Sequence, residues 1–238
     1  MSSLTLVRHG QATAFAADTD RLSPLGESQA RVLGKYWADN GIAFDEVYSG
    51  SLIRQRHTAA IVAEAVSTAH RPWPQLRVDP DFNEYDGDGI VKLLVPALQQ
   101  ERPEFAKLVL AAREASHGPE RNRHFQRMFE VVVARWVSGE LSAPEVEPWA
   151  AFRDRVHRGL GKITAAAGNR RVVLFTSGGV IGVMVQSALN APDMSAVQLN
   201  WRVRNCSLTE FVFSKNRLSL DSFNAIPHLV DSALHSFR

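Results

Sequence analysis

Leu4-Thr5-Leu6-Val7-Arg8-His9-Gly10 is the stretch that decides both the fold and the site. The apolar run from Leu4 to Val7 predicts a short buried strand, and Gly10 permits the tight turn that ends it. Arg8 carries a planar fork of donors that suits two phosphate oxygens. His9 can be a neutral imidazole near pH 7 and can therefore act as a nucleophile. The pattern predicts a strand whose carboxyl end opens into an anion-binding loop.

Two later segments repeat the order of strand, polar turn and helix. Glu46 to Tyr48 predicts a strand that leads through Ser49-Gly50-Ser51 into a helix. Arg171 to Thr176 is the strongest predicted strand, and Ser177-Gly178-Gly179 turns it into an apolar helix. Ligands of open α/β sheets bind at the carboxyl ends of the strands. We therefore expect both turns to meet the Arg8-His9 loop at one edge of a sheet.

Strands that alternate with helices predict an α/β fold of three layers, α/β/α, with a mostly parallel central sheet. Ser23 is expected to cap a helix that starts at Pro24 and stops at Asn40-Gly41. Residues from about 90 to 148 are expected to form a helical insertion within a single domain that spans 1–238. The other predicted features are a strand at Leu76 to Val78, a break in the insertion near His117-Gly118-Pro119, a helix at Trp149 to Ala167, and a closing hairpin of Leu208 to Phe213 with Leu218 to Phe223 around Lys215-Asn216.

The bulk composition narrows the class of protein. The 238 residues are 45% hydrophobic, which suffices for one well-packed core. The formal net charge is only +2 and no dense basic run is present, which argues against a nucleic-acid partner. Cys206 is the only cysteine, so neither an intrachain disulfide nor a cysteine zinc cluster can form. No apolar run approaches the ~20 residues that span a bilayer, and no secretory signal is visible. These features predict a cytoplasmic protein without a membrane partner.

Several segments of the chain, in order, resemble those of the histidine phosphatase superfamily, which is phosphoglycerate mutase-like. The opening Arg-His-Gly-Gln-Ala is most similar to the phosphatase-type branch. Only the region from about 90 to 148 carries no matching motif. The matching segments are Leu6 to Ala12, Leu22 to Ala30, Ser49 to Arg54 with Thr58-Ala59, Phe82-Asn83-Glu84, Val172 to Ile181, Asn205 to Thr209, and Phe223-Asn224 to His228-Leu229.

The resemblance implies a two-step phosphoryl transfer that needs neither a metal nor a cofactor. His9 would attack phosphorus and form a phosphohistidine, while Glu84 would act as the general acid and base. Arg8 and Arg54 would hold the phosphoryl oxygens. Asp86 is the main rival of Glu84 for the acid/base role. The expected partner is a phosphorylated small-molecule substrate or a phosphoprotein.

The chain departs from the family pattern at Ser177, which stands where members carry a second pocket histidine. A serine hydroxyl is a weaker donor than a charged imidazole. The replacement is expected to cost ~2–4 kcal/mol of transition-state stabilisation, or roughly two to three decades in rate. The backbone N–H groups of Gly178-Gly179 at a helix start could compensate. Gln11, Thr176 or a histidine from elsewhere could also fill the gap.

Three functions remain open from the sequence. The favoured one is a phosphomonoesterase that is weak or specialised because of Ser177. The first alternative is a non-catalytic module that binds phosphoesters or phosphoproteins through a degenerate site. The second is a phosphoglycerate mutase, which the opening motif disfavours. The identity of the substrate depends on the insertion and the rim of the pocket, which no short motif describes.

Overall fold

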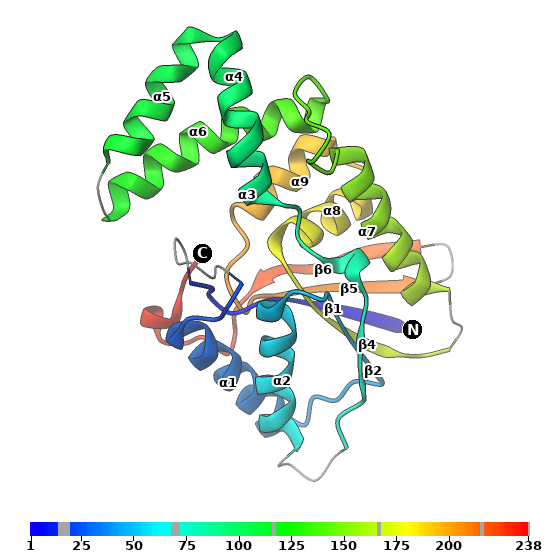
Figure 1. Ribbon diagram of the computed structural model, residues 1–238. Helices are drawn as coiled ribbons and strands as arrows, with labels where there is room; N and C mark the ends of the chain where they lie inside the picture. Colours follow the sequence, from blue (N-terminus) through cyan, green and yellow to red (C-terminus); the bar gives the residue numbers. More distant parts are fainter. Residues whose placement is uncertain (14–19, 68–71, 116–117, 166–167, 215–216, 238) are drawn as a thin grey trace. The chain divides into compact units, whose positions relative to one another are not determined.

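The computed structural model describes residues 1–13, 20–67, 72–115, 118–165, 168–214 and 217–237. The chain forms two compact units (Figure 1). The first comprises Met1–Glu84 with Arg155–Arg238, and the second comprises Tyr85–Asp154. The second unit is therefore an insertion in the sequence of the first.

The first unit is built on a six-stranded sheet in the order β3-β2-β4-β1-β5-β6. The first four strands in this order run parallel, β5 pairs antiparallel with β1, and β6 pairs antiparallel with β5, so β5 alone among these six strands runs in the opposite direction. Arg8 lies opposite Thr176, and Ser49 lies opposite Phe175, so three strands end at the same edge. The strands are β1 (Ser2–Arg8), β2 (Glu46–Ser49), β3 (Leu76–Val78), β4 (Arg171–Thr176), β5 (Leu208–Ser214) and β6 (Arg217–Ala225).

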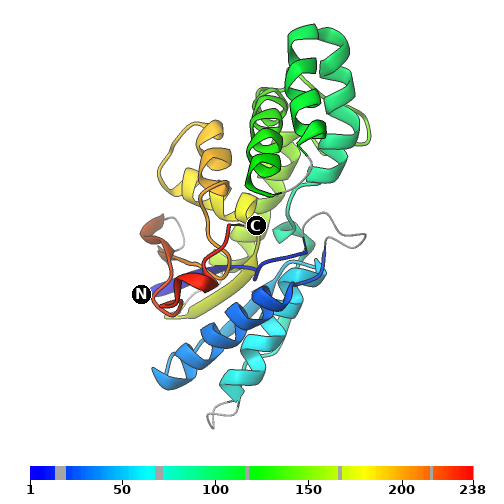
Figure 2. The ribbon, with the colours of Figure 1, turned by 90° about the vertical axis from the view of Figure 1, so that its left-hand side faces the viewer.

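Helices cover both faces of this sheet and complete the predicted three layers (Figures 1 and 2). On one face lie α1 (Pro24–Asp39) and α2 (Ile53–Ser67). On the other lie α8 (Gly178–Ala188), with α9 (Asp193–Asn200) packed on it, and the part of α7 (Trp149–Thr164) that belongs to this unit. The α/β fold with a mostly parallel sheet is thus confirmed.

The core between the sheet and the first pair of helices follows from the alternation of strand residues. Alternate residues of a strand face opposite sides of the sheet, and Val7 and Phe175 pack with Leu33 and Trp37 of α1 in one buried cluster. Leu6 and Leu174, one position away from Val7 and Phe175, are also fully buried. A sheet that is buried on both faces reads as continuous apolar runs, which is why β1 and β4 were recognisable from the sequence.

The caps of α1 show why that helix could be located from the sequence. The Ser23 hydroxyl accepts a hydrogen bond of 3.1 Å from the backbone N–H of Gly26, and Pro24 occupies the first helical position. At the other end Asn40 caps the helix, and Gly41 takes a φ of 62°, which a glycine adopts without strain. The predicted bounds are confirmed.

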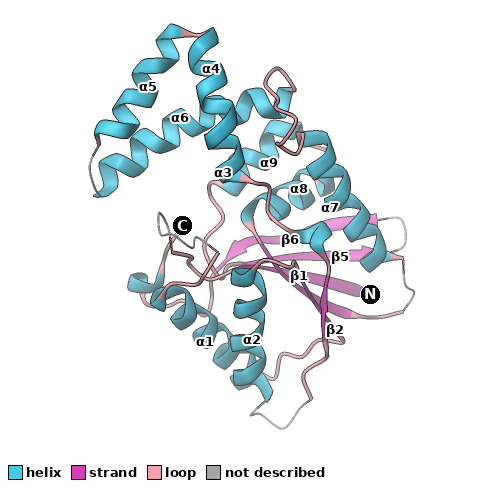
Figure 3. Ribbon diagram, viewed as in Figure 1, coloured by secondary structure: helices cyan, strands magenta, loops and turns pink. Residues whose placement is uncertain are grey.

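All regular elements in the described residues of the second unit are helices (Figure 3). Pro103 starts a new helix directly after α4, a break that the sequence analysis did not predict. The rings of Tyr85, Trp136 and Phe152 are in contact within this unit. No helix in the described parts of the chain combines the length and the apolar character needed to cross a membrane. The helices are α3 (Gly87–Gly89), a π-helical stretch (Ile90–Leu94), α4 (Val95–Glu101), α5 (Pro103–Glu114), α6 (Gly118–Ser138) and the first turn of α7.

The structure differs from the predicted elements at a few places among the described residues. The helix α9 was not predicted. The helix α7 ends at Thr164, and its predicted end at Ala167 lies outside the described residues. The hairpin of β5 and β6 is present, and its expected turn at Lys215-Asn216 lies outside the described residues.

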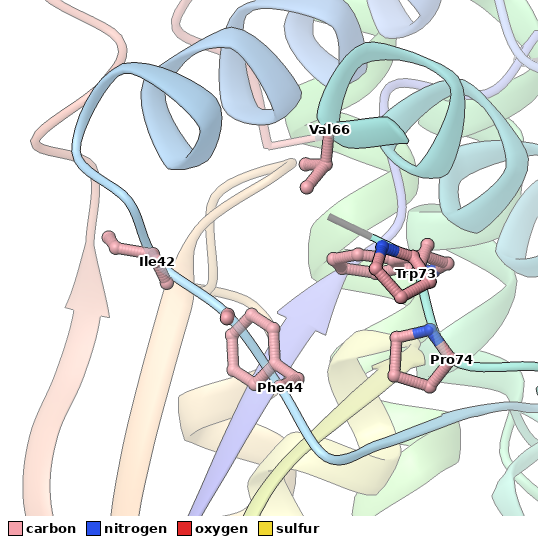
Figure 4. Close-up of a pocket in the computed structure, with 7 residues that line it drawn as sticks. Ile42, Phe44, Val66, Trp73 and Pro74 are labelled. Carbon is pink, nitrogen blue, oxygen red and sulfur yellow. The ribbon is translucent and has the colours of Figure 1, made fainter. Parts of the chain in front are cut away.

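An apolar pocket of about 250 Å³ lies at the edge of the sheet where β2 begins (Figure 4). Phe44 and Trp73 form its aromatic wall, with ring centroids 6.0 Å apart. His9 lies at the opposite edge, where the parallel strands end. The pocket lining is Ile42, Ala43, Phe44, Val66, Pro72, Trp73 and Pro74, and these side chains provide no charged group for a phosphate.

Candidate active site

His9 directly follows β1, and its imidazole is fixed at both ring nitrogens. Nδ1 lies 2.7 Å from the carbonyl oxygen of Gly10, which can only accept a hydrogen bond. Nε2 lies 3.2 Å from Nε of Arg54, which can only donate. The proton of the neutral ring therefore sits on Nδ1, and Nε2 carries the lone pair that a nucleophile needs.

Burial and positive charge keep the imidazole of His9 neutral. The residue is 6% exposed. The pKa of His9 is held well below its ordinary value of 6.5, first by loss of hydration and then by the charges of Arg54 and Arg8. The bond to the Gly10 carbonyl opposes this shift without reversing it. The ring is consequently an unprotonated base at neutral pH.

Arg54 lies in the first turn of α2 and is held by Asp20. Its Nη1 forms an ion pair of 2.8 Å with Oδ1 of Asp20, and its side chain is 17% exposed. The other carboxylate oxygen of Asp20 accepts a bond of 2.8 Å from the backbone N–H of Ile53, so Asp20 also caps the helix. One carboxylate thus fixes both the helix start and the guanidinium that faces His9.

Arg8 and Gln11 lie on either side of the His9-Gly10 turn. Arg8 is 9% exposed, and its Nη1 donates to the carbonyl oxygen of Val203. The Oε1 of Gln11 accepts a bond of 2.8 Å from the hydroxyl of Ser23 at the start of α1. The amide of Gln11 therefore belongs to the cap region of α1, and its phosphate contact remains a prediction.

Glu84 lies at the amino end of α8. Its Oε2 accepts a bond of 3.0 Å from the backbone N–H of Gly179, where the helix carries partial positive charge. One of the N–H groups expected to serve a phosphate is therefore occupied by Glu84 in this state. Gly178 leaves no room for a side chain, since a Cβ there would lie 2.1 Å from Oδ1 of Asn200. Asp86, the rival carboxylate, accepts a bond of 2.8 Å from the N–H of Gly89 within α3.

Arg155 of α7 holds the backbone that presents Glu84. Its Nη1 lies 3.1 Å from the carbonyl oxygen of Asp81 and 2.7 Å from that of Asn83, and its Nη2 lies 3.3 Å from that of Glu84. Sequence reasoning missed this residue. Because the contacts are to backbone carbonyls, no complementary side chain marks them in the sequence.

Ser177 is fully buried at the junction of β4 and α8. It occupies the capping position of α8 but makes no capping bond with its side chain. Instead its hydroxyl oxygen accepts a bond of 2.8 Å from Nε2 of Gln55. The Thr176 hydroxyl, considered above as a replacement donor, is directed to the carbonyl of Phe82 at 2.8 Å.

Gln55 is a further residue of the site that sequence reasoning missed. It is fully buried, and its position was readable from spacing. The buried residues of α2 include Gln55, Ala59, Val62 and Val66, which recur every three or four positions. The one polar member of this apolar face was the available signal.

A segment near the carboxyl end of the chain braces the His9 loop. Nδ2 of Asn205 donates a bond of 3.0 Å to the carbonyl oxygen of His9. The hydroxyl of Ser236 donates to Oδ1 of Asn205 at 2.9 Å, and Nε2 of Gln29 donates to the same hydroxyl oxygen at 2.9 Å. The loop, α1 and this segment are thus joined by polar contacts.

Cys206 lies beneath the same loop, and its thiol is shielded from solvent. It is fully buried, and its backbone N–H donates to the carbonyl of Arg8 at 3.0 Å. Burial raises the pKa of its thiol. Among the residues that the structure describes, no group of three or more His, Cys, Asp or Glu side chains is placed to hold a metal ion.

The sequence profile of the histidine phosphatase superfamily (branch 1) matches residues 4–138 and 111–226. The strand-end histidine, the facing arginine and the carboxylate at the helix start lie within these ranges. The chain belongs to the histidine phosphatase superfamily.

Similar proteins include both mutases and phosphatases. The probable phosphoglycerate mutase GpmB of Erwinia tasmaniensis is 24% identical over 249 residues, with both chains fully covered. A putative α-ribazole-5'-P phosphatase from Escherichia coli has a TM-score of 0.65 at 18% identity, over 94% of this chain and 98% of that one. Phosphoserine phosphatase from Entamoeba histolytica, in complex with 3-phosphoglyceric acid, has a TM-score of 0.64 at 20% identity, over 97% and 100%. A mycobacterial glucosyl-3-phosphoglycerate phosphatase with inorganic phosphate has a TM-score of 0.63 at 23% identity, over 96% and 100%.

Proposed function

We propose that the protein is a phosphomonoesterase that works through a phosphohistidine on His9. The observation that carries the proposal is the state of the His9 ring, whose Nε2 is unprotonated and faces Arg54 at 3.2 Å. A neutral buried imidazole beside a fixed guanidinium is a nucleophile next to an anion-binding group. Membership of the superfamily and the phosphatase names among the structural neighbours support the same chemistry.

The reaction has two steps in this proposal. In the first, Nε2 of His9 forms a bond to phosphorus as the bond from phosphorus to the leaving oxygen breaks, and Glu84 gives its proton to that oxygen. In the second, Glu84 takes a proton from water, whose oxygen attacks phosphorus and breaks the N–P bond. His9 is regenerated, and the products are an alcohol and inorganic phosphate. The two proposed steps use His9, Glu84 and water, and they involve neither a metal ion nor a cofactor.

The remaining site residues bind the phosphoryl group in this proposal. Arg8 and Arg54 neutralise its oxygens, and Arg54 exchanges its contact with His9 for one with the substrate. Ser177 and the N–H of Gly178 donate from the start of α8, and Gln11 contributes from the turn after β1. Their common action is to stabilise charge that grows in the transition state.

The test is turnover of a panel of phosphomonoesters by wild type and His9→Ala, with labelling from a radioactive phosphodonor that is quenched in denaturing detergent at alkaline pH. We expect wild type to release phosphate and to carry an acid-labile label, and His9→Ala to do neither. Wild-type turnover in His9→Ala would overturn the assignment of the nucleophile.

One observation favours a second candidate, a non-catalytic module that binds phosphoesters or phosphoproteins. The Oε2 of Glu84 is engaged by the backbone N–H of Gly179 at 3.0 Å, and Ser177 offers a neutral hydroxyl where the resemblance to the family implies a histidine. Such a module would bind inorganic phosphate but acquire no label. A phosphoglycerate mutase, suggested by the similarity to GpmB, would return the label to a second phosphoglycerate oxygen instead of releasing it.

The proposal extends to the setting of the protein. A phosphorylated small molecule is the substrate class we favour, as the names of the neighbours suggest. The chain acts as one domain with a helical insertion. The single cysteine suits a reducing compartment such as the cytoplasm.

A further inference from the structure

Gln55 and Ser177, which are distant in the sequence, form a buried polar pair at the site. Both are fully buried, and Nε2 of Gln55 lies 2.8 Å from the hydroxyl oxygen of Ser177. A buried amide is costly unless its groups are satisfied. The directions of the hydrogen bonds of Gln55 therefore determine which donors Gln55 and Ser177 still have available for a ligand.

The amide orientation of Gln55 is set by two backbone groups. Its Nε2 lies 3.1 Å from the carbonyl oxygen of Phe82, which only accepts. Its Oε1 lies 3.3 Å from the backbone N–H of Leu52, which only donates. The second amide proton then points to Ser177. Both amide protons of Gln55 are used, so its side chain has no donor left for a phosphate.

Ser177 is left with one donor. A hydroxyl group has one proton and two lone pairs, and the bond from Gln55 occupies a lone pair of Ser177. The proton of the hydroxyl must therefore point away from Gln55. A hydroxyl that accepts a bond is also a better donor, because hydrogen bonds in a chain polarise one another.

The pair lies beside the nucleophile. Gln55 directly follows Arg54, whose Nε faces His9. Ser177 directly follows Thr176, whose carbonyl oxygen accepts a bond of 2.9 Å from the N–H of His9. The hydroxyl thus lies between the His9 loop and the start of α8.

We propose that Gln55 is a positioning residue that holds the Ser177 hydroxyl with its proton directed at the transferring phosphoryl group. This inference rests on the proposed function. In this proposal Gln55 and Ser177 together take the place of the histidine donor that the resemblance to the family implies at position 177. Gln55 also fills the adjacent space, so a histidine at position 177 would meet its amide. A histidine introduced at position 177 therefore needs the Gln55 side chain to be shortened as well.

The first experiment measures kcat and KM for Ser177→Ala, Gln55→Leu and the double variant on one phosphomonoester. We expect each single variant to lower kcat roughly 10- to 100-fold, with KM changed by less than about threefold, because the bond is strongest in the transition state. The double variant should be no slower than Ser177→Ala, since Gln55 acts only through Ser177. If the two losses multiply, Gln55 acts independently of Ser177 and the proposal is wrong.

The second experiment needs no turnover. Orthovanadate, a mimic of the five-coordinate transition state, is titrated calorimetrically into wild type and the same variants after their thermal midpoints are measured. We expect about tenfold weaker binding in both single variants and no further loss in the double. Equal affinity in all four proteins would overturn the inference. A different outcome is also informative. If vanadate binds with the expected pattern but the radioactive phosphodonor leaves no label on His9, the enzymatic proposal is wrong and the role of Gln55 in positioning the Ser177 hydroxyl stands.

The third experiment replaces the pair. Ser177→His alone should be no faster than wild type, whereas Gln55→Ala/Ser177→His should exceed Ser177→His in kcat by about tenfold or more. If Ser177→His alone has a higher kcat than wild type, Gln55 does not occupy the space that the histidine needs, and the inference is wrong.

Discussion

The Nε–H of Arg54 lies 3.2 Å from Nε2 of His9, so a permanent cation faces the lone pair of the proposed nucleophile. In the proposed mechanism this contact couples phosphate binding to the protonation of the histidine. A cation at this distance disfavours imidazolium and leaves the ring ready to attack.

The first prediction concerns the pH dependence of Arg54→Gln. The pKa of His9 is well below 6.5 in part because of Arg54, so the acid limb of kcat/KM in wild type should lie well below pH 6.5. Removing the cation raises the pKa of His9, and the acid limb should move to higher pH, in addition to a rate loss of roughly 10²–10³-fold. Arg56→Gln, an exposed neighbour on α2, is the control and should leave the profile unchanged. If the acid limb of kcat/KM stays at the same pH in Arg54→Gln, Arg54 does not control the protonation of His9.

The second prediction concerns Arg155→Met. Without the guanidinium, the carbonyls of Asn83 and Glu84 lose this donor, and the backbone that presents Glu84 is held less firmly, although its carboxylate keeps the bond from Gly179. We expect kcat to fall by about tenfold or more, because small misplacement of a catalytic group is costly. Arg153→Met, on the same helix and paired with adjacent Asp154, should retain wild-type kcat. Equal kcat in the two variants would show that Arg155 does not position Glu84.

The third prediction compares two glycine substitutions. A Cβ at Gly10 would lie 2.4 Å from the carbonyl oxygen of Gly26, so Gly10→Ala must shift the His9 loop. We expect it to lower the free energy of unfolding by about 1–3 kcal/mol and to abolish turnover. Gly161→Ala, in α7, meets open space among the described residues and should raise that free energy by about 0.5–1 kcal/mol. Urea denaturation of both variants measures the contrast.

The fourth prediction concerns His228, which is 5% exposed and packs near the ring of Tyr36. Burial lowers the pKa of His228 to about 4, although the backbone of Cys206 opposes this shift. The unfolded chain binds the proton near pH 6.5, so the native state loses stability as the pH falls from 6.5 towards 4. Between pH 7 and pH 5 this loss should be about 2 kcal/mol and should be absent in His228→Phe. Denaturation midpoints of both proteins at the two pH values test it, and equal losses would contradict the assignment.

Much of the fold was predictable because its signals are local. The buried strands β1 and β4 are continuous apolar runs, and α1 is bounded by its own capping residues. The helix α9 lacks such a signal, since few of its residues are buried. It is held by close backbone packing, because a Cβ at Gly182 of α8 would lie 2.1 Å from the carbonyl oxygen of Ala196.

The candidate site likewise contains residues with a local sequence signal and residues without one. His9, Arg54 and Glu84 belong to short motifs, and the structure brings His9 and Arg54 into contact. Gln55 and Arg155 were missed because their partners are backbone carbonyls or a distant serine, and such contacts exist only after the strands have been placed side by side.

The bond from Ser236 to Asn205, and from Asn205 to the carbonyl of His9, has a practical consequence for anyone who produces the protein. A bulky label attached at Ser236 would lie two hydrogen bonds from the backbone of His9 and would disturb the loop that holds this residue. Met1 is 88% exposed and lies beside the other end of β1, so a label there would leave both bonds intact.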